Sequence, residues 1–154
     1  MKNIIFRPAT ANDAEAIASS VWELKAEDRP LNPADKDEYV KNAAGHIRNR
    51  LGRDLFPWVA YDGACLVANI NVVAVNKLPK PGMLHPKWGR ISNVRTAPEY
   101  RNKGVGSILM EKVIAWAQEQ EFEELLVCPS ELSVTFYERA GFKSENDVME
   151  LLLE

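Results

Sequence analysis

The chain has 154 residues, of which 46% are hydrophobic and 27% charged, and its 22 acidic and 19 basic side chains give a formal net charge of −3. This length and composition predict one globular domain over residues 1–154 with a sizeable core, and they exclude a disordered, collagen-like or coiled-coil chain. The negative balance argues against general attraction to nucleic acid or to an anionic membrane.

The first half of the chain predicts short strands and two helices. Residues 4–7 are apolar and end at a proline, which predicts a strand, and apolar residues recur at helical spacing over 13–26. A proline-rich break separates this helix from a more polar one over 34–50. Residues 58–61 and 64–75 predict two strands, joined by an Asp-Gly hairpin signal.

The second half predicts alternating strands and helices. A basic, proline-rich loop leads to a strand over 89–96, and a helix with a clear apolar stripe follows over 105–120. A short apolar strand over 125–128 and a helix over 131–140, ended by a glycine, come next. Apolar residues 148–153 predict a closing strand. The order predicts a single α/β (α+β) domain in which helices flank a mixed central sheet.

The sequence has no pattern typical of a membrane-spanning helix, a signal peptide, a disulfide framework or a metal site. No apolar stretch approaches the roughly 20 residues of a membrane-spanning helix, and the N-terminus has no signal-peptide pattern, so we expect a soluble, cytoplasmic protein. Cys65 and Cys128 each lie in an apolar run without ligand-spaced neighbours. We therefore expect buried cysteines, no disulfide framework and no metal site.

The most informative loop joins a predicted strand to a predicted helix and combines glycine with positive charge. Gly104 and Gly106 fall at the helix start, where backbone amides lack partners and the helix dipole favours an anion. Arg101 and Lys103 add charge beside this turn. Neither the Walker P-loop nor the dinucleotide fingerprint fits, because the lysine precedes the glycines and the third glycine is absent. The pattern predicts a phosphate-binding loop; the alternative is a plain turn whose glycines only allow helix packing.

Two segments resemble motifs of the GCN5-related N-acetyltransferases (the GNAT family). Arg101-Asn102-Lys103-Gly104-Val105-Gly106 resembles the family's Q/R-x-x-G-x-G/A motif. Residues 130–142 resemble the block in which many members read FYE-x-x-GF. The motifs stand in the family's order, and the order of elements matches along nearly the whole chain. The resemblance implies a GNAT-like fold and acetyl-CoA as the acetyl donor, without a metal.

The resemblance also implies roles for particular residues. The strand edge at Val94 and Thr96 would pair with the pantetheine arm, and the amides from Arg101 to Ser107 would hold the pyrophosphate. Tyr137 would be catalytic, donating a proton to the departing thiolate, with a purely packed core tyrosine as the alternative. The implied coenzyme-binding residues are Val94, Arg95, Thr96, Arg101, Asn102, Lys103, Gly104, Val105, Gly106, Ser107, Ser130 and Ser133.

Two positions depart from the family pattern. Ser130 stands where many relatives have an asparagine that touches the cofactor arm. The strand before the glycine loop lacks the Glu or Asp that many relatives use as general base, and Asn93 cannot accept a proton, although it could orient an amine or a water. The base is therefore unassigned. The candidates are His85, Glu23, Glu27 and Asp28, and for each the alternative is a solvated surface residue.

The function implied is transfer of an acetyl group from acetyl-CoA to a primary amine of a small molecule or peptide, by direct attack in a ternary complex. The expected acceptor-binding residues are Trp22, His85 and Asn93. A non-catalytic coenzyme A-binding module of the same fold is the alternative. No nucleic-acid or membrane partner is expected. A homodimer, common among relatives, stands as an open alternative to a monomer.

Overall fold

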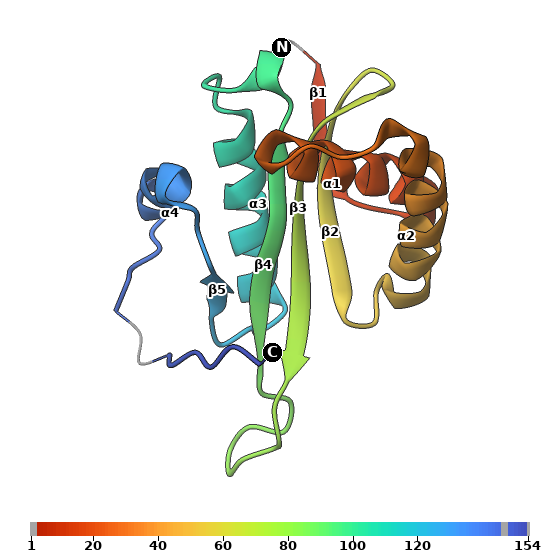
Figure 1. Cartoon of the computed structure of the whole chain (residues 1–154). Coiled ribbons are helices and arrows are strands. Elements are labelled where there is room, and N and C mark those ends of the chain that lie inside the picture. The colour runs from red at the N-terminus through yellow and green to blue at the C-terminus, as the bar shows by residue number, and fades with distance from the viewer. Residues whose placement is uncertain (1–2, 146–147, 154) are drawn as a thin grey trace.

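Five strands form one mixed sheet in the chain order β1-β2-β3-β4-β5 (Figure 1). The computed structural model describes residues 3–145 and 148–153. The strands are β1 (Ile4–Pro8), β2 (Leu55–Asp62), β3 (Cys65–Asn76), β4 (Lys87–Thr96) and β5 (Leu125–Val127). Neighbouring strands from β1 to β4 are antiparallel, whereas β5 is parallel to β4. This sheet, with the helices described next, confirms the predicted fold class.

Helices cover both faces of the sheet. They are α1 (Ala14–Asp28), α2 (Lys36–Arg50), α3 (Val105–Glu119) and α4 (Val134–Arg139). On one face, α1 and α2 bury Ile17 and Ile47 together with Val59 of β2. On the opposite face, α3 buries Leu109 in a second cluster with Ile70 of β3. Because successive strand residues point to opposite faces, the central strands supply side chains to both cores.

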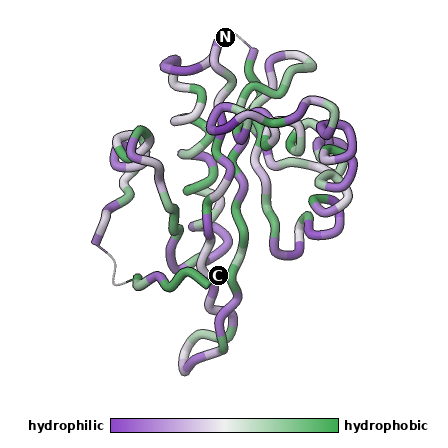
Figure 2. Tube along the Cα trace, in the orientation of Figure 1, coloured by the Kyte–Doolittle hydropathy of each residue, from purple (hydrophilic) through white to green (hydrophobic). Residues whose placement is uncertain are grey.

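The predicted closing strand at residues 148–153 is wrong. These residues have no regular structure, and their large apolar side chains are exposed, from 66% for Val148 to 95% for Met149. Figure 2 shows the stretch as a hydrophobic segment, coloured green, that lies outside the sheet. An apolar run shows that a segment favours burial, but a strand forms only where a neighbouring strand accepts its backbone hydrogen bonds.

Two smaller predictions also fail. Cys65 and Cys128 are free and exposed, not buried. Cys65 begins β3 directly after the hairpin turn, and Cys128 follows the last residue of β5, so both lie at strand ends. The helix predicted over 131–140 begins with a single 3-10 turn, Glu131–Ser133, and is α-helical only from Val134.

A buried carboxylate anchors β1 to the start of α1. Asp13 is 4% exposed and accepts two hydrogen bonds from Arg7, at 2.7 and 3.0 Å, and one from the Tyr61 hydroxyl at 2.9 Å. The Arg7 hydrogen bonds lower the pKa of Asp13 to about 2, from an ordinary value of 3.8. Burial and the same carboxylate raise the pKa of Tyr61 to about 12. The ionised form of Asp13 is therefore part of the folded state.

Asp13→Asn is expected to lower the free energy of unfolding by about 2 kcal/mol at neutral pH, since a pKa unit corresponds to about 1.4 kcal/mol. A carboxyl group whose pKa is lowered by folding stabilises the folded protein at pH values above the pKa of that group in the unfolded chain. That stabilisation disappears as the pH falls from about 4 towards 2. Urea unfolding at pH 7 and near pH 2 measures this, and the variant and the parent should converge at the lower pH. An equal difference in the free energy of unfolding at both pH values would contradict the assignment.

Asp54→Asn, at an exposed ion pair with Arg50, is the control and should barely move the urea midpoint.

No helix among residues 3–145 and 148–153 combines the length and apolarity that crossing a membrane requires.

Candidate functional site

β4 departs from both of its neighbours at Asn93 and Val94. On the β3 side, Asn69 pairs with Arg95 but Asn71 pairs with Ser92, so the two β4 residues between them bulge out of register. Asn93 has a φ of 50°, in the left-handed region that Asn tolerates better than most residues. The bulge interrupts the regular ladder at this point of the strand.

On its other side, β4 diverges from β5. The parallel pairing ends at Ile91 and Val127, so the part of β4 from Ser92 to Thr96 has no strand beside it among the described residues. The strands are in tight contact before this point. A Cβ built on Gly89 would lie 2.7 Å from Cδ2 of Leu125, so only glycine fits there without a shift. A strand edge left open in this way can pair with an extended, amide-bearing ligand.

The two glycines at the start of α3, Gly104 and Gly106, are required for different structural reasons. Gly104 precedes α3 with a φ of 82°, and a Cβ built on it would meet no atom within 4 Å. A Cβ on Gly106 would lie 3.1 Å from Oγ1 of Thr96 and 3.4 Å from the Phe136 ring. The packing alternative therefore accounts for Gly106. At Gly104 the requirement is the left-handed turn, and the space beside it is open.

The first turn of α3 presents unused amides. The first helical hydrogen bond runs from the Ile108 N–H to the Gly104 carbonyl, at 3.0 Å, so the N–H groups of Val105, Gly106 and Ser107 come before it. Asn102 is also left-handed, with a φ of 59°. Successive turns of this kind direct N–H groups into a concave anion-binding surface. The local geometry therefore suits a phosphate.

The two cations of the loop already have partners. Lys103 donates from Nζ to the Glu99 carbonyl at 2.8 Å. Arg101 donates from Nε to the Thr96 carbonyl at 2.9 Å and from Nη2 to both carboxylate oxygens of Glu27, each at 2.7 Å. In this arrangement the backbone amides, and not free cationic side chains, make up most of what the loop offers an anion.

The contact with Arg101 bears on Glu27 as a candidate base. The hydrogen bond from Arg101 is the largest cause that lowers the pKa of Glu27, and Arg95 adds a weaker contact at 3.4 Å. A general base for amine chemistry needs a pKa raised towards neutrality, so Glu27 is shifted in the wrong direction. Glu23 is paired with Lys36 at 2.5 Å. Asp28 is exposed at the end of α1. None of the acidic candidates is positioned as an evident base.

Tyr137 lies on α4 and is 7% exposed. Its ring packs edge-on against Phe136 and Phe142, with centroids 5.1 and 5.6 Å apart. It belongs to the same buried cluster as Val105 of α3 and also lines a pocket of about 200 Å³ beside β5. Burial raises the pKa of Tyr137, so the phenol keeps its proton further above neutral pH. No hydrogen bond joins its hydroxyl to a described residue.

The structure brings three of the predicted segments together. The end of β4, the first turn of α3 and α4 meet at Gly106, which is in contact with both Thr96 and Phe136. Ser130 and Ser133 lie on the approach to α4, where their hydroxyl groups are 3.0 Å apart and Ser133 also donates to the Ser130 carbonyl. These hydroxyls contact each other within the short turn before α4 and make no capping hydrogen bond to its backbone amides.

The predicted acceptor residues are dispersed. Asn93 forms the bulge itself. Trp22 is on α1, which contacts β3 and β4, and its ring packs on Tyr39 of α2 with centroids 5.4 Å apart. His85 is exposed in the loop before β4, at the end of the sheet opposite the glycine loop (Figure 1). The part of β4 from Lys87 to Asn93 spans roughly 20 Å, so His85 is remote from the bulge.

Sequence reasoning missed two buried polar residues near the bulge: Asn69, which contacts it, and Ser20, which contacts Asn69. Asn69 is fully buried on β3 and donates from Nδ2 to the Asn93 carbonyl at 2.9 Å. Ser20 of α1 donates to Oδ1 of Asn69 at 2.5 Å. The signal that could have found Asn69 is the interruption of an otherwise apolar strand by two asparagines, Asn69 and Asn71.

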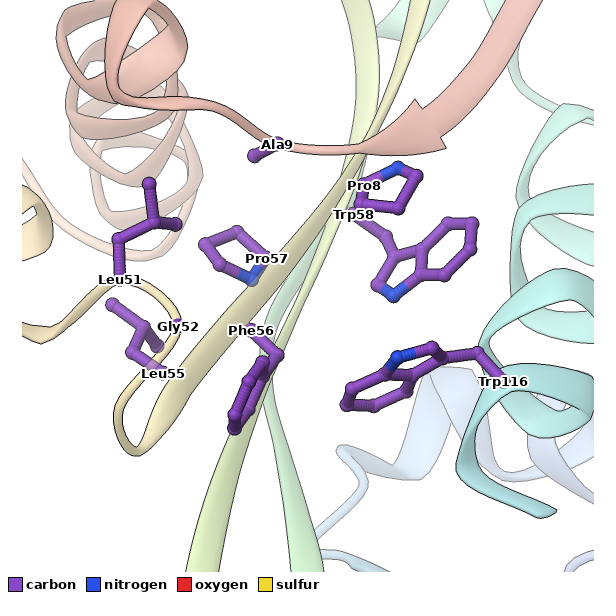
Figure 3. A pocket seen from close by; sticks show the side chains of 9 residues that line it. All are labelled: Pro8, Ala9, Leu51, Gly52, Leu55, Phe56, Pro57, Trp58 and Trp116. Atoms are coloured by element: carbon purple, nitrogen blue, oxygen red, sulfur yellow. The ribbon is translucent and has the colours of Figure 1, made fainter. Parts of the chain in front are cut away.

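A second pocket, of about 110 Å³, is apolar and lies away from this region (Figure 3). Trp58 of β2 and Trp116, near the end of α3, pack edge to face on one side of it, with ring centroids 6.2 Å apart. Val105 and Trp116 are separated by about 16 Å along the helix. These two tryptophans are core packing, and the pocket offers no polar group that could carry chemistry.

In the part of the chain that the structure describes, no group of three or more His, Cys, Asp or Glu side chains could hold a metal ion.

Comparisons with known proteins identify the family and the fold of the chain. Residues 18–142 match a model of the acetyltransferase (GNAT) family. The chain is similar in fold to a predicted acetyltransferase from Clostridium acetobutylicum, crystallised with acetyl-CoA, at 20% identity and a TM-score of 0.75 over 97% of this chain and 96% of that one. It is similar to a GCN5-related N-acetyltransferase from Ralstonia eutropha JMP134, at 21% identity and a TM-score of 0.76 over 97% and 99% of the chains.

A third similar structure is glucosamine-6-phosphate N-acetyltransferase from Arabidopsis thaliana, at 17% identity and a TM-score of 0.73 over 99% of both chains. At these identities the similarity is one of fold. No curated protein sequence matches the chain at a significant level.

Proposed function

We propose, because this chain belongs to the acetyltransferase (GNAT) family, that it transfers an acetyl group from acetyl-CoA to a primary amine of a small molecule or peptide. The observation that carries the proposal is the divergence of β4 from β5 after Ile91, where β4 bulges at Asn93 and Val94 and then reaches the first turn of α3 at Thr96. An extended chain of amides that ends in a pyrophosphate fits this combination, because the open strand edge and the helix start lie side by side.

The residues present fit the coenzyme. On the side of β4 away from β3, no strand pairs with the backbone from Val94 to Thr96, so this edge could pair with the pantetheine arm once Arg101 releases the Thr96 carbonyl. The N–H groups of Val105, Gly106 and Ser107 would donate hydrogen bonds to the pyrophosphate, and the open space beside Gly104 is the space that a Cβ would otherwise enter. When bound, the coenzyme supplies an acetyl group activated as a thioester.

The chain's own groups would then assist transfer within a ternary complex. The acceptor amine would attack the thioester carbonyl, whose oxygen the Val94 N–H polarises, and Tyr137 would donate its proton to the sulfur as the C–S bond breaks. The proton that the nitrogen loses on becoming an amide would return to the Tyr137 phenolate, directly or through water. Holding the two reactants side by side supplies much of the rate. Since Glu27 and Glu23 are held in ion pairs, we propose an acceptor amine that reaches the site already unprotonated. The cytoplasmic location and the homodimer remain predictions from the sequence.

Glu27→Gln is expected to leave kcat within about threefold of the parent and the acidic limb of the pH–rate profile unmoved. Glu27 has a lowered pKa because it is paired with Arg101, so it carries charge for the arginine and does not cycle a proton. Steady-state rates between pH 5 and 9 check this. A loss above about 100-fold together with disappearance of the acidic limb would instead identify Glu27 as the base. Glu23→Gln is the matched control on the same helix.

Two measurements test the function. Isothermal titration calorimetry with acetyl-CoA comes first, followed by a panel of primary amines in which released coenzyme A is titrated with a thiol reagent. Because Cys65 and Cys128 are exposed, a blank without amine is subtracted. Coenzyme binding with turnover of at least one amine supports the proposal. Binding without turnover of any amine favours the non-catalytic module, and absence of binding rejects both.

A further inference from the structure

We propose that Asn69 and Ser20 are positioning residues for acetyl transfer: together they hold the β4 bulge so that the Val94 N–H points at the thioester carbonyl. The inference rests on the proposed function, since it concerns how the chain would polarise the acetyl group. Neither residue would contact the coenzyme or the acceptor amine. Their role would be exerted through the backbone of β4.

A continuous chain of hydrogen bonds joins three elements at this point. Ser20 of α1 donates from Oγ to Oδ1 of Asn69 at 2.5 Å, and Asn69 of β3 donates from Nδ2 to the carbonyl of Asn93 in β4 at 2.9 Å. Asn69 is fully buried and Ser20 is 7% exposed. The Ser20 bond fixes which end of the Asn69 amide faces the bulge, because the oxygen is already engaged and the NH₂ group remains for Asn93.

The bulge needs such a partner. Asn93 falls outside the β3–β4 register, so the backbone of β3 does not pair with it in the regular ladder. Buried carbonyls are nearly always hydrogen-bonded, and here a side chain takes the place of the missing ladder donor. The same bond holds Asn93 in its left-handed conformation, with a φ of 50°. Asn69 therefore substitutes for a strand partner at the Asn93 carbonyl.

Peptide geometry links this bond to the reaction. The Asn93 carbonyl and the Val94 N–H belong to one planar trans peptide unit, in which C=O and N–H point in opposite directions. Holding the Asn93 oxygen towards the Asn69 amide turns the Val94 N–H away from that amide, which would direct it to the side of β4 that β5 has left open. That is the side on which the proposed thioester would lie. The orientation of the donor thus depends on Asn69.

Asn71 provides a matched comparison. It lies two residues further along β3, on the same face, and is 5% exposed. Its Oδ1 is buried without a hydrogen-bond partner among the described residues, and it pairs in register with Ser92 beyond the bulge. A buried asparagine on this strand is therefore not enough. Only Asn69 reaches the displaced carbonyl.

The test uses the infrared band of the thioester carbonyl in bound acetyl-CoA labelled with ¹³C at the acetyl carbonyl, which needs no acceptor amine. In the parent protein we expect this band at lower frequency than in free acetyl-CoA. In Asn69→Leu it should return most of the way to the free position, with the Kd of acetyl-CoA within about threefold of the parent. With any amine that is turned over, kcat should fall by about tenfold while KM for acetyl-CoA is unchanged, because a misdirected donor affects the transition state most.

Asn71→Leu is the control and should keep the parent band. Ser20→Ala removes only the hydrogen bond that orients Asn69 and should shift the band towards the free position by a smaller amount than Asn69→Leu. If Asn69→Leu does not fold, the band of Ser20→Ala tests the inference. An unshifted band in the parent, or a parent-like band in both Asn69→Leu and Ser20→Ala, overturns this inference and leaves the proposed function standing. Failure of the parent to bind acetyl-CoA overturns both.

Discussion

Tyr137→Phe is expected to lower kcat of acetyl transfer by at least about 100-fold while leaving the Kd of acetyl-CoA unchanged. The substitution removes the only group of Tyr137 that can protonate the leaving sulfur and keeps the ring that packs against Phe136 and Phe142. Because burial raises the pKa of Tyr137, any basic limb of the parent pH–rate profile that reports this phenol should lie above the ordinary pKa of 10. Single-turnover rates together with calorimetry of acetyl-CoA binding separate chemistry from binding.

The control for this variant is Tyr100→Phe, which removes a hydroxyl that donates to Asp62 at 2.7 Å and leaves Tyr137 untouched. It should retain the parent kcat. Unchanged turnover in Tyr137→Phe would mean that Tyr137 is only a packed core residue, the alternative that its 7% exposure also permits. Thermal denaturation of Tyr137→Phe should match the parent, since the phenol makes no hydrogen bond to a described residue.

Gly104→Ala is expected to weaken acetyl-CoA binding by about 30-fold, equivalent to roughly 2 kcal/mol. Two effects combine. A Cβ is strained at a φ of 82°, and it enters the open space beside the unused amides of α3 where the pyrophosphate would lie. Calorimetry with acetyl-CoA measures the loss. Raising the salt concentration should weaken parent binding, because the interaction is with a polyanion.

Gly63→Ala is the matched control for this prediction. Gly63 lies in the hairpin between β2 and β3, has a φ of 59°, and also has no atom within 4 Å of a built Cβ. Alanine there imposes the same kind of backbone strain away from the site. The two variants should lose similar stability, and only Gly104→Ala should lose affinity. Equal acetyl-CoA affinity in the two variants would exclude the loop before α3 as the pyrophosphate site.

The contacts of Glu27 connect the two halves of the proposed site. Glu27 lies near the end of α1, the helix that also carries Ser20, and it binds Arg101 in the glycine loop. Thus one helix contacts both Asn69, which holds the bulge, and the loop that would bind the pyrophosphate. The Glu27 contact neutralises the charge of Arg101, whereas Lys103 donates to a backbone carbonyl and keeps its charge. The backbone amides remain as the main anion-binding groups.

Local patterns predicted most of the fold. Helical spacing located α1, α2 and α3, and the hairpin signal at Asp62-Gly63 placed the turn between β2 and β3. The failures concern the environment of correctly recognised apolar segments. Residues 148–153 are hydrophobic and yet exposed, and Cys65 and Cys128 lie at strand ends. Periodicity reports which residues favour burial, but whether a segment finds a partner depends on chain regions far away in the sequence.

By itself the sequence determined the motif-bearing parts of this protein: the glycine loop at the start of a helix and the aromatic block around Tyr137, because a tight turn and a helix start are decided by neighbouring residues. Only the tertiary structure decided which of these groups are free to act. The contacts that bend and orient β4 join residues 49 and 24 positions apart, and those that occupy Arg101 span 74. Hydrogen bonds over such separations depend on how the helices pack on the sheet, and no local pattern encodes that packing.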